Sequence, residues 1–478
     1  MTQATSTDQP TGTVLSRAMR PLNTVIERII PSALTFAIVL TLVVMVLAWV
    51  LTGTPLISFA DRDTTIAAVV SGEVLPPDII TAWGQGLSGL LAFITQIALV
   101  LLLGHALAHT RPAARFFKWV SSLPKTPMAA YLLVFGVAAV ANLFSWGLGL
   151  VVGALLAVQV AKYGRRNGLR LHFPMLVAAG FSANVLWHMG YSGSAPLSMT
   201  DPNNPVAAGF GGTIPLSETT YAGWNLVAVV LVAAAVTLAI VLVAPREKDL
   251  IAQMPDTGED AAEEADEVLT PADRIDASRI LTTVLGVLVI VFIIVYFVRG
   301  GAMDINMVNW TFLALLLLLV KGPFELSRLV RNAAANVGEI LLQFPLYAGI
   351  MGIMSGTGLI QILSDAIVSV ASPATFGLLA VLSAGIVNVF VPSGGGQFAV
   401  QGPVLLDAAG QLGVDPAIPV MAIAYGDAWT NMIQPFWAIP VLAIAGLKIR
   451  DILGYTTVTL FASGAVFLGV MLYLGLTA

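Results

Sequence analysis

The sequence contains no cysteine, and only 10% of its 478 residues are charged. Without thiols the chain has neither a disulfide framework nor a thiolate metal site. Its four histidines show no metalloprotease-type spacing, and there is no basic patch of the kind that binds nucleic acid. Soluble domains carry about 25% charged residues, whereas 57% of this chain is hydrophobic, which is more than a soluble core absorbs. The composition predicts an all-α polytopic membrane protein without a cofactor.

Long apolar runs without charge are the main positive signal. A helix needs about 20 apolar residues to cross a bilayer, and the first run is longer than the core of a signal peptide. Loops rich in Lys and Arg are expected in the cytoplasm, which places the polar segment 1–30 there. The sequence predicts about nine full spans of this kind, over residues 32–52, 81–108, 171–190, 222–243, 280–298, 304–320, 332–354, 418–447 and 453–475.

Two further apolar segments are interrupted, and we predict that each forms a re-entrant helical hairpin. Hairpin 128–161 is broken around residues 142–149, and hairpin 374–410 is broken around residues 391–397. Proline and consecutive glycines interrupt a helix, and broken backbone at membrane depth is tolerated only beside protein or a water-filled cavity. Each predicted arm has about 12–15 residues, fewer than a full span needs. A plain loop between two short spans is the alternative.

The two interrupted segments have related surroundings. Asn142 follows a Thr-Pro pair at the separation at which Asn388 follows a Ser-Pro pair. The flanks of the first hairpin are basic and those of the second lack Lys and Arg, so the flanks are predicted on opposite sides of the membrane. Inverted repeats with interrupted helices are typical of secondary transporters. The predicted domains are a first membrane repeat over 31–244, a flexible cytoplasmic linker over 245–279 and a second membrane repeat over 280–478.

The interrupted helices supply a candidate solute site. Helix N-termini bind an anion without a cationic side chain, and neither hairpin contains Lys or Arg. A small carboxylate is therefore the expected ligand. Amide side chains within lipid face a partner or a cavity, and plain interhelical hydrogen bonding is the alternative. The predicted substrate-binding residues are Asn142, Ser145, Trp146, Gly147, Ser182, Asn184, Asn388, Pro392, Ser393, Gly394, Gly395, Gly396, Gln397 and Asn431.

Asp427 is an acidic residue inside a predicted span. A carboxylate in a low-dielectric environment takes up a proton more readily, and a neutral side chain there would not repel an incoming anion. Asp427 and Thr430 are therefore predicted to bind the coupling ion, which is H⁺ or, with carbonyls of an unwound helix, Na⁺. A purely structural hydrogen bond is the third possibility.

Three sequence runs carry a resemblance to a known family: residues 142–149, 187–196 and 391–403. They resemble the bacterial short-chain fatty acid transporter family (AtoE type), over about residues 14–475 of the chain. The resemblance implies a multi-pass protein of the inner membrane that carries acids such as acetoacetate or butyrate. Through the wider ion-transporter superfamily it also implies a homodimer, by analogy alone.

Other functions stay open from the residues. A carrier for a dicarboxylate or citrate would favour Arg or Lys near the site, which the hairpins lack. A channel fits two inverted interrupted elements less well than alternating access does. An intramembrane enzyme would need a catalytic cluster, and ATP-driven transport would need a Walker motif; the sequence shows neither. Symport of a small monocarboxylate is therefore the prediction, and the protein is predicted not to be an enzyme.

Overall fold

The described part of the chain is entirely helical, which confirms the all-α prediction. Segment 1–30 and most of linker 245–279 lie outside the described residues. The computed structural model describes residues 33–58, 78–89, 91–200, 202, 204–245, 254, 270–301, 305–334 and 337–477.

Six helices of the described part are long and apolar enough to cross a membrane. This agrees with the predicted membrane protein, although the predicted number of spans is not tested by length alone. The six are α7 (Pro127–Phe144), α8 (Trp146–Arg166), α12 (Gly223–Val243), α14 (Arg279–Val298), α19 (Pro373–Phe390) and α23 (Ile449–Thr477).

Three predicted spans are divided by interruptions. Residues 81–108 form α4 (Ile79–Ser88) and α5 (Leu91–Ala108) rather than one helix. The other two interruptions contain predicted site residues, Asn184 in the first and Asn431 in the second. Their segments are α9 (Phe173–Ser182) with the 3₁₀ stretch η1 (Ala183–Met189), and α21 (Ala417–Thr430) with the 3₁₀ stretch η2 (Asn431–Ile433) and α22 (Pro435–Ala445). A 3₁₀ stretch inside a helix often marks a functional position.

The first hairpin consists of α7 and α8, which pack against each other and are separated by Ser145 alone. The Thr126 hydroxyl oxygen caps α7 by accepting a hydrogen bond from the Ala129 N–H at 3.2 Å. The arms have 18 and 21 residues, so the prediction of shorter arms was wrong. The residues on both sides of Ser145, from Asn142 to Gly149, stay helical, which lengthens both arms. Helices of this length rise about 30 Å, which is enough to cross a bilayer. The length of the arms therefore does not support the re-entrant form, which stays a prediction.

The second hairpin consists of α19 and α20 (Gly394–Leu412), with arms of 18 and 19 residues. Gly394, Gly395 and Gly396 were predicted to break the helix, and this was wrong: they form the first turn of α20. The break lies at residues 391–393, where Pro392 and extended Ser393 interrupt the chain. The Ser393 hydroxyl oxygen accepts the Gly396 N–H at 3.3 Å, and none of these glycines has a positive φ. Glycine costs up to about 1 kcal/mol relative to alanine in a helix, and the Ser393 cap stabilises the start of α20 against that cost.

The same order of elements recurs in both halves: a helical hairpin, then a helix interrupted by a 3₁₀ stretch. The halves meet in the middle of the molecule, where α21 packs against α19 and η1, and α22 packs against α8. This arrangement brings both interruptions to the centre. The other described helices are α2 (Ala33–Thr52), α6 (Arg111–Ser121), α10 (Ser194–Ser198), α11 (Pro205–Phe210), α13 (Pro271–Asp276), α15 (Ile305–Leu319), α16 (Pro323–Ala334), α17 (Gly338–Gly356) and α18 (Leu359–Val368).

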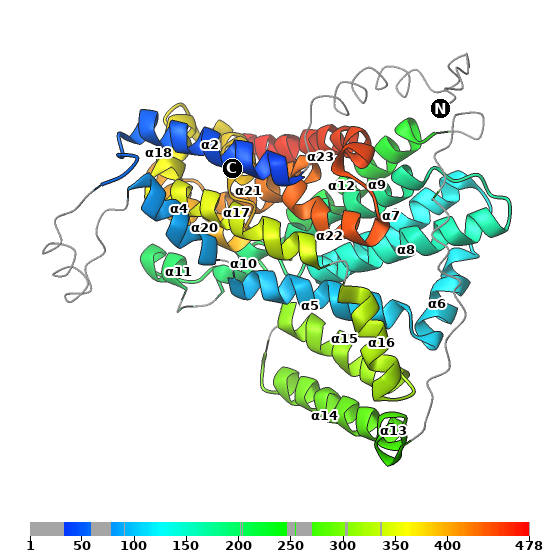
Figure 1. Ribbon diagram of the computed structural model, residues 1–478. Helices are drawn as coiled ribbons and strands as arrows, with labels where there is room; N and C mark the ends of the chain where they lie inside the picture. The colour runs from blue at the N-terminus through cyan, green and yellow to red at the C-terminus, as the bar shows by residue number, and fades with distance from the viewer. Residues whose placement is uncertain are drawn as a thin grey trace, which may run out of the picture.

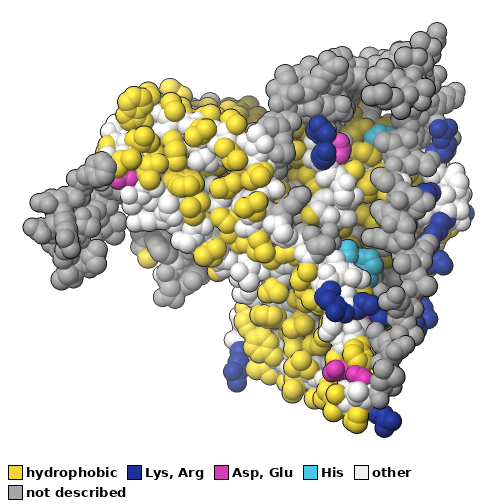
Figure 2. Space-filling model, in the orientation of Figure 1, with side chains coloured by type: hydrophobic (Ala, Val, Ile, Leu, Met, Phe, Trp, Pro, Cys, Tyr) yellow, Lys and Arg dark blue, Asp and Glu magenta, His cyan; other side chains and the backbone are white. Residues whose placement is uncertain are grey.

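Helices α14, α15 and α16 form a limb that is attached to the rest of the molecule through α5 (Figure 1). Hydrophobic side chains cover much of the limb (Figure 2). On α14, Ile280 is 71% exposed and Val298 is 81% exposed. An apolar surface of this extent fits contact with lipid chains rather than with water.

Candidate functional site

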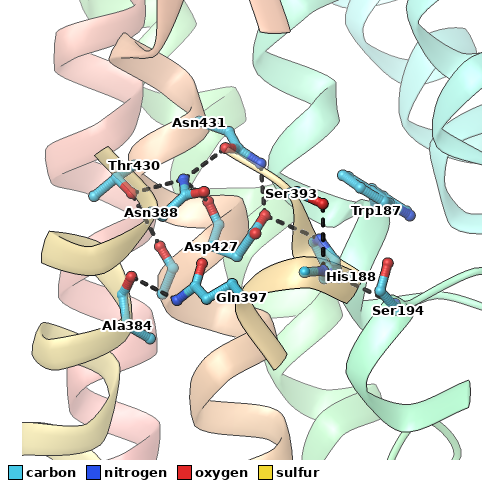
Figure 3. A network of polar contacts seen from close by, with 12 residues as sticks. Trp187, His188, Ser194, Ala384, Asn388, Ser393, Gln397, Asp427, Thr430 and Asn431 are labelled. Carbon is cyan, nitrogen blue, oxygen red and sulfur yellow. Dashed lines mark hydrogen bonds and ion pairs between the residues drawn. The ribbon is translucent and has the colours of Figure 1, made fainter. Parts of the chain in front are cut away.

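Asp427 of α21 lies at the centre of the molecule and is 0% exposed. Its Oδ1 lies 3.0 Å from His188 Nε2 and accepts a hydrogen bond from Asn431 Nδ2 at 2.8 Å (Figure 3). Its Oδ2 is buried and has no hydrogen-bond partner among the described residues. An unpaired buried acceptor costs about 1–3 kcal/mol. The carboxylate is therefore half satisfied and is suited to receive a donor or a cation.

Asn388, at the end of the first arm of hairpin two, ties that hairpin to the interrupted helix. Its Nδ2 group donates to the Asp427 carbonyl at 2.9 Å, to Thr430 Oγ1 at 3.0 Å and to Asn431 Oδ1 at 2.6 Å. The Thr430 hydroxyl donates in turn to the Gly385 carbonyl at 2.9 Å. Thr430 thus uses its hydrogen within the fold, whereas Asn388 Oδ1 stays buried without a partner in the described structure.

Gln397 joins the two arms of hairpin two. Its Nε2 donates to the Ala384 carbonyl and to Gln401 Oε1, both at 2.9 Å. Its Oε1 is a further buried acceptor without a hydrogen-bond partner in the described structure. Figure 3 shows Asn388, Gln397 and Asp427 around the same central space. Three oxygen acceptors of this region thus lack donors: Asp427 Oδ2, Asn388 Oδ1 and Gln397 Oε1.

His188 of η1 belongs to this centre, although it was not among the predicted site residues. It is 1% exposed, and its Nδ1 accepts the Ser194 N–H at 3.3 Å. The tip of hairpin two rests on its ring, because a Cβ added at Gly394 would lie 2.7 Å from His188 Nε2. The sequence signal that would have found it was available: a histidine inside an interrupted apolar span.

Hairpin one contributes an aromatic contact to the same region. The Trp146 ring lies 5.5 Å from the Trp187 ring and 5.2 Å from the Trp437 ring, between centroids. Trp187 in turn stacks beside His188 at 3.8 Å. Ser145 is buried and is the N-terminal cap residue of α8, but its side chain makes no capping hydrogen bond. The tip of hairpin one therefore reaches the centre through indole rings.

Other predicted residues do not reach Asp427 in the described structure. Asn142 Nδ2 donates to the Ala138 carbonyl at 2.8 Å on its own helix. The Ser182 hydroxyl lies 3.0 Å from Thr459 Oγ1 of α23, which agrees with interhelical hydrogen bonding. Asn184 is fully buried, and neither polar atom of its side chain has a hydrogen-bond partner within the described residues.

The tip residues of the two hairpins also differ in how closely they are packed. A Cβ at Gly147 would make ordinary contacts with Val100 at 3.7 Å, and Pro392 is buried. Gly395 is exposed, and a Cβ there would meet nothing within 4 Å. Gly395 is therefore the open position of the second tip, next to the closely packed Gly394.

No fixed positive charge balances Asp427. The elements nearest to it, α19, α20, α21, α22, η1, η2 and α10, are described throughout and contain no Lys or Arg. Burying a carboxylate without a compensating charge is costly. The titratable partner of Asp427 in the described structure is His188, which is charged only if it is protonated.

Comparisons with known proteins agree over nearly the whole chain. A family profile described as short chain fatty acid transporter matches residues 14–474. A protein of Escherichia coli (strain K12), provisionally named a short-chain fatty acid transporter, is 36% identical over 462 residues, or 95% of this chain and 98% of that protein. A Haemophilus influenzae protein with the same provisional name is 34% identical over 475 residues, or 95% of this chain and 99% of that protein.

A solved structure, that of the Alcanivorax borkumensis YdaH transporter, covers 92% of this chain and 98% of its own, at 15% identity and a TM-score of 0.45. That likeness is too low to carry an argument. The family match, together with the apolar helices, defines the chain as a membrane transporter. It belongs to the short-chain fatty acid transporter family, which confirms the resemblance seen in the sequence.

Proposed function

We propose that the protein is a secondary active transporter that moves short-chain fatty acid anions across the inner membrane together with H⁺ or Na⁺. The observation that carries the proposal is the buried, half-satisfied Asp427 carboxylate between an interrupted helix and a hairpin tip, without a fixed cation. A site of this kind takes up a small cation and a small anion together. The names of the two relatives support the substrate class.

The anion site of the proposal lies at the N-terminus of α20. Ser393 occupies the cap position, and the first turn starts with the buried Gly394 and the exposed Gly395. Unpaired N–H groups and the helix dipole favour a carboxylate there. A single carboxylate is favoured over a dicarboxylate or citrate, because the second negative charge would find no Lys or Arg in α19 or α20.

The cation belongs at Asp427. An anion approaching an ionised carboxylate in a medium of low dielectric is repelled, so anion binding and cation binding support each other. Thr430, which was predicted to help bind the ion, uses its hydrogen bonds with Asn388 and Gly385, and it positions the site in this proposal. The predicted inverted repeats, re-entrant hairpins and homodimer are parts of the same proposal.

Counterflow in proteoliposomes tests the function. Vesicles preloaded with unlabelled butyrate or acetoacetate are expected to accumulate labelled acid transiently above equilibrium, which a channel does not do. Protein-free vesicles measure passive permeation of the neutral acid, which is subtracted. Succinate and citrate in place of the preloaded acid are expected to give no overshoot. Absence of an overshoot with every short-chain acid would refute the proposed function.

A further inference from the structure

The titratable side chain in contact with Asp427 comes from the other half of the chain. His188 and Asp427 are 1% and 0% exposed, and their side chains meet at 3.0 Å. Building on the proposed function, we propose that His188 and Asp427 bind the transported proton as one unit, and that His188 is a coupling residue. Nothing else in the described structure joins the two interrupted helices through titratable groups.

One hydrogen bond assigns the tautomer of His188 in the form of the pair that has not yet taken up a proton. A backbone N–H only donates, so His188 Nδ1, which receives the Ser194 N–H at 3.3 Å, is an acceptor. The single ring hydrogen is thereby assigned to Nε2, which faces Asp427 Oδ1. A neutral imidazole beside an ionised carboxylate has a net charge of −1. Uptake of one proton brings the pair to zero.

Two atoms can receive that proton. Asp427 Oδ2 has no hydrogen-bond partner among the described residues, so a proton there displaces nothing. His188 Nδ1 takes a proton only if the Ser194 hydrogen bond opens. Because the two side chains are in direct contact, the proton belongs to the pair rather than to either residue.

His188 and Asp427 are the titratable pair that joins the two halves at the centre of the described structure, and buried tyrosines lie on neighbouring helices at Tyr347 of α17 and Tyr425 of α21. Among the elements packed there, α10, α19, α22 and η2 carry no titratable side chain. On α21, the Tyr425 hydroxyl donates to Asn225 Oδ1 at 2.6 Å. On α20, Asp407 is exposed and accepts from Gln411 at 2.7 Å. The ends of flanking helices carry Tyr131, Lys162, Tyr163, Arg165, Arg166, Arg450, Asp451, Tyr455 and Tyr473.

This arrangement makes the transport cycle electroneutral, because one proton crosses with one monocarboxylate anion. A pH difference of one unit then supports about tenfold accumulation, and the membrane potential supports none. The competing cation is Na⁺, which would use the donor-free oxygens of Asp427, Asn388 and Gln397. The histidine favours the proton, because imidazole is the side chain that ordinarily changes charge near neutral pH.

The test compares His188→Gln with the parent in proteoliposomes. Glutamine keeps an N–H group beside Asp427 but does not titrate. Because the neutral acid also permeates protein-free vesicles and accumulates there, the readout is the initial rate of uptake above that of protein-free vesicles, relative to each variant's own counterflow rate. An inward pH gradient is expected to raise this ratio in the parent and in the matched control His109→Gln, at an exposed histidine, but not in His188→Gln. A raised ratio in His188→Gln, or uptake driven by a Na⁺ gradient at constant pH, would overturn the inference.

A second variant tests the same proposal if His188→Gln fails to fold. Asp427→Asn keeps the shape of the side chain and an acceptor for the Asn431 amide but removes the titratable carboxylate. Its uptake is expected to lose the acceleration by an inward pH gradient. An acceleration equal to that of the parent would contradict the proposal. Loss of counterflow by the parent would instead refute the proposed function itself.

Discussion

A methyl group added at Gly394 is expected to impair transport, while the same change at Gly410, on the same helix, is tolerated. An alanine Cβ at position 394 would lie 2.7 Å from His188 Nε2 and 3.0 Å from Ser194 Oγ. Carbon contacts are ordinarily about 3.5–4.0 Å, so the tip of hairpin two must shift by about 1 Å. Overpacking of this kind costs about 1–3 kcal/mol. Since 1.4 kcal/mol is a factor of ten, the arrangement in which the tip of hairpin two rests on His188 becomes about 5- to 150-fold less populated.

Gly410→Ala is the matched control, because this glycine is exposed and a Cβ there meets nothing within 4 Å. Both glycines lie in α20 without a positive φ, and alanine is the better helix former at either position. The assay is the initial rate of butyrate counterflow per reconstituted protein. We expect a rate near that of the parent for Gly410→Ala and a loss of at least about fivefold for Gly394→Ala. Equal rates in the two variants would refute the packing argument.

Two further predictions concern stability and topology. Asn388→Ala removes the donor to three buried acceptors and should lower the free energy of unfolding by about 2–4 kcal/mol, measured by thermal unfolding in detergent. The control Asn167→Ala, at an exposed residue, should change the free energy of unfolding little. Equal effects of the two substitutions would contradict the role of Asn388. Since the chain has no cysteine, Thr126→Cys and Ser372→Cys can be labelled without background. An impermeant maleimide should reach them from opposite sides of the membrane, and labelling from one side excludes inverted repeats.

The sequence predicted the local features of the fold well, because they depend on neighbouring residues. Apolar runs predicted α12, α14 and α23 closely. The polar residues predicted after the hairpins, Asn184 and Asn431, lie in the 3₁₀ interruptions. Asn388, Asn431 and Asp427 lie together in the structure. Their proximity follows from two interruptions placed next to each other along one half of the chain.

Features that depend on tertiary packing were predicted less well. The glycines of hairpin two looked like a break, but the cap at Ser393 allows them to start a helix. The contact between His188 and Asp427 joins the two halves of the chain, and no local pattern specifies it. Ser182 was predicted to bind substrate, and in the described structure its hydroxyl lies beside Thr459 of α23; its part in substrate binding stays a prediction.

Substrate protection at the tip of hairpin two tests the central claim most directly. Gly395→Cys places one thiol at the open position of that tip, in a chain that has no other. A saturating concentration of butyrate or acetoacetate is predicted to slow labelling of this thiol several-fold, while labelling of Ser372→Cys at the far end of α19 stays unchanged. Equal labelling rates at Gly395→Cys with and without the acid would contradict a substrate site at the hairpin tip.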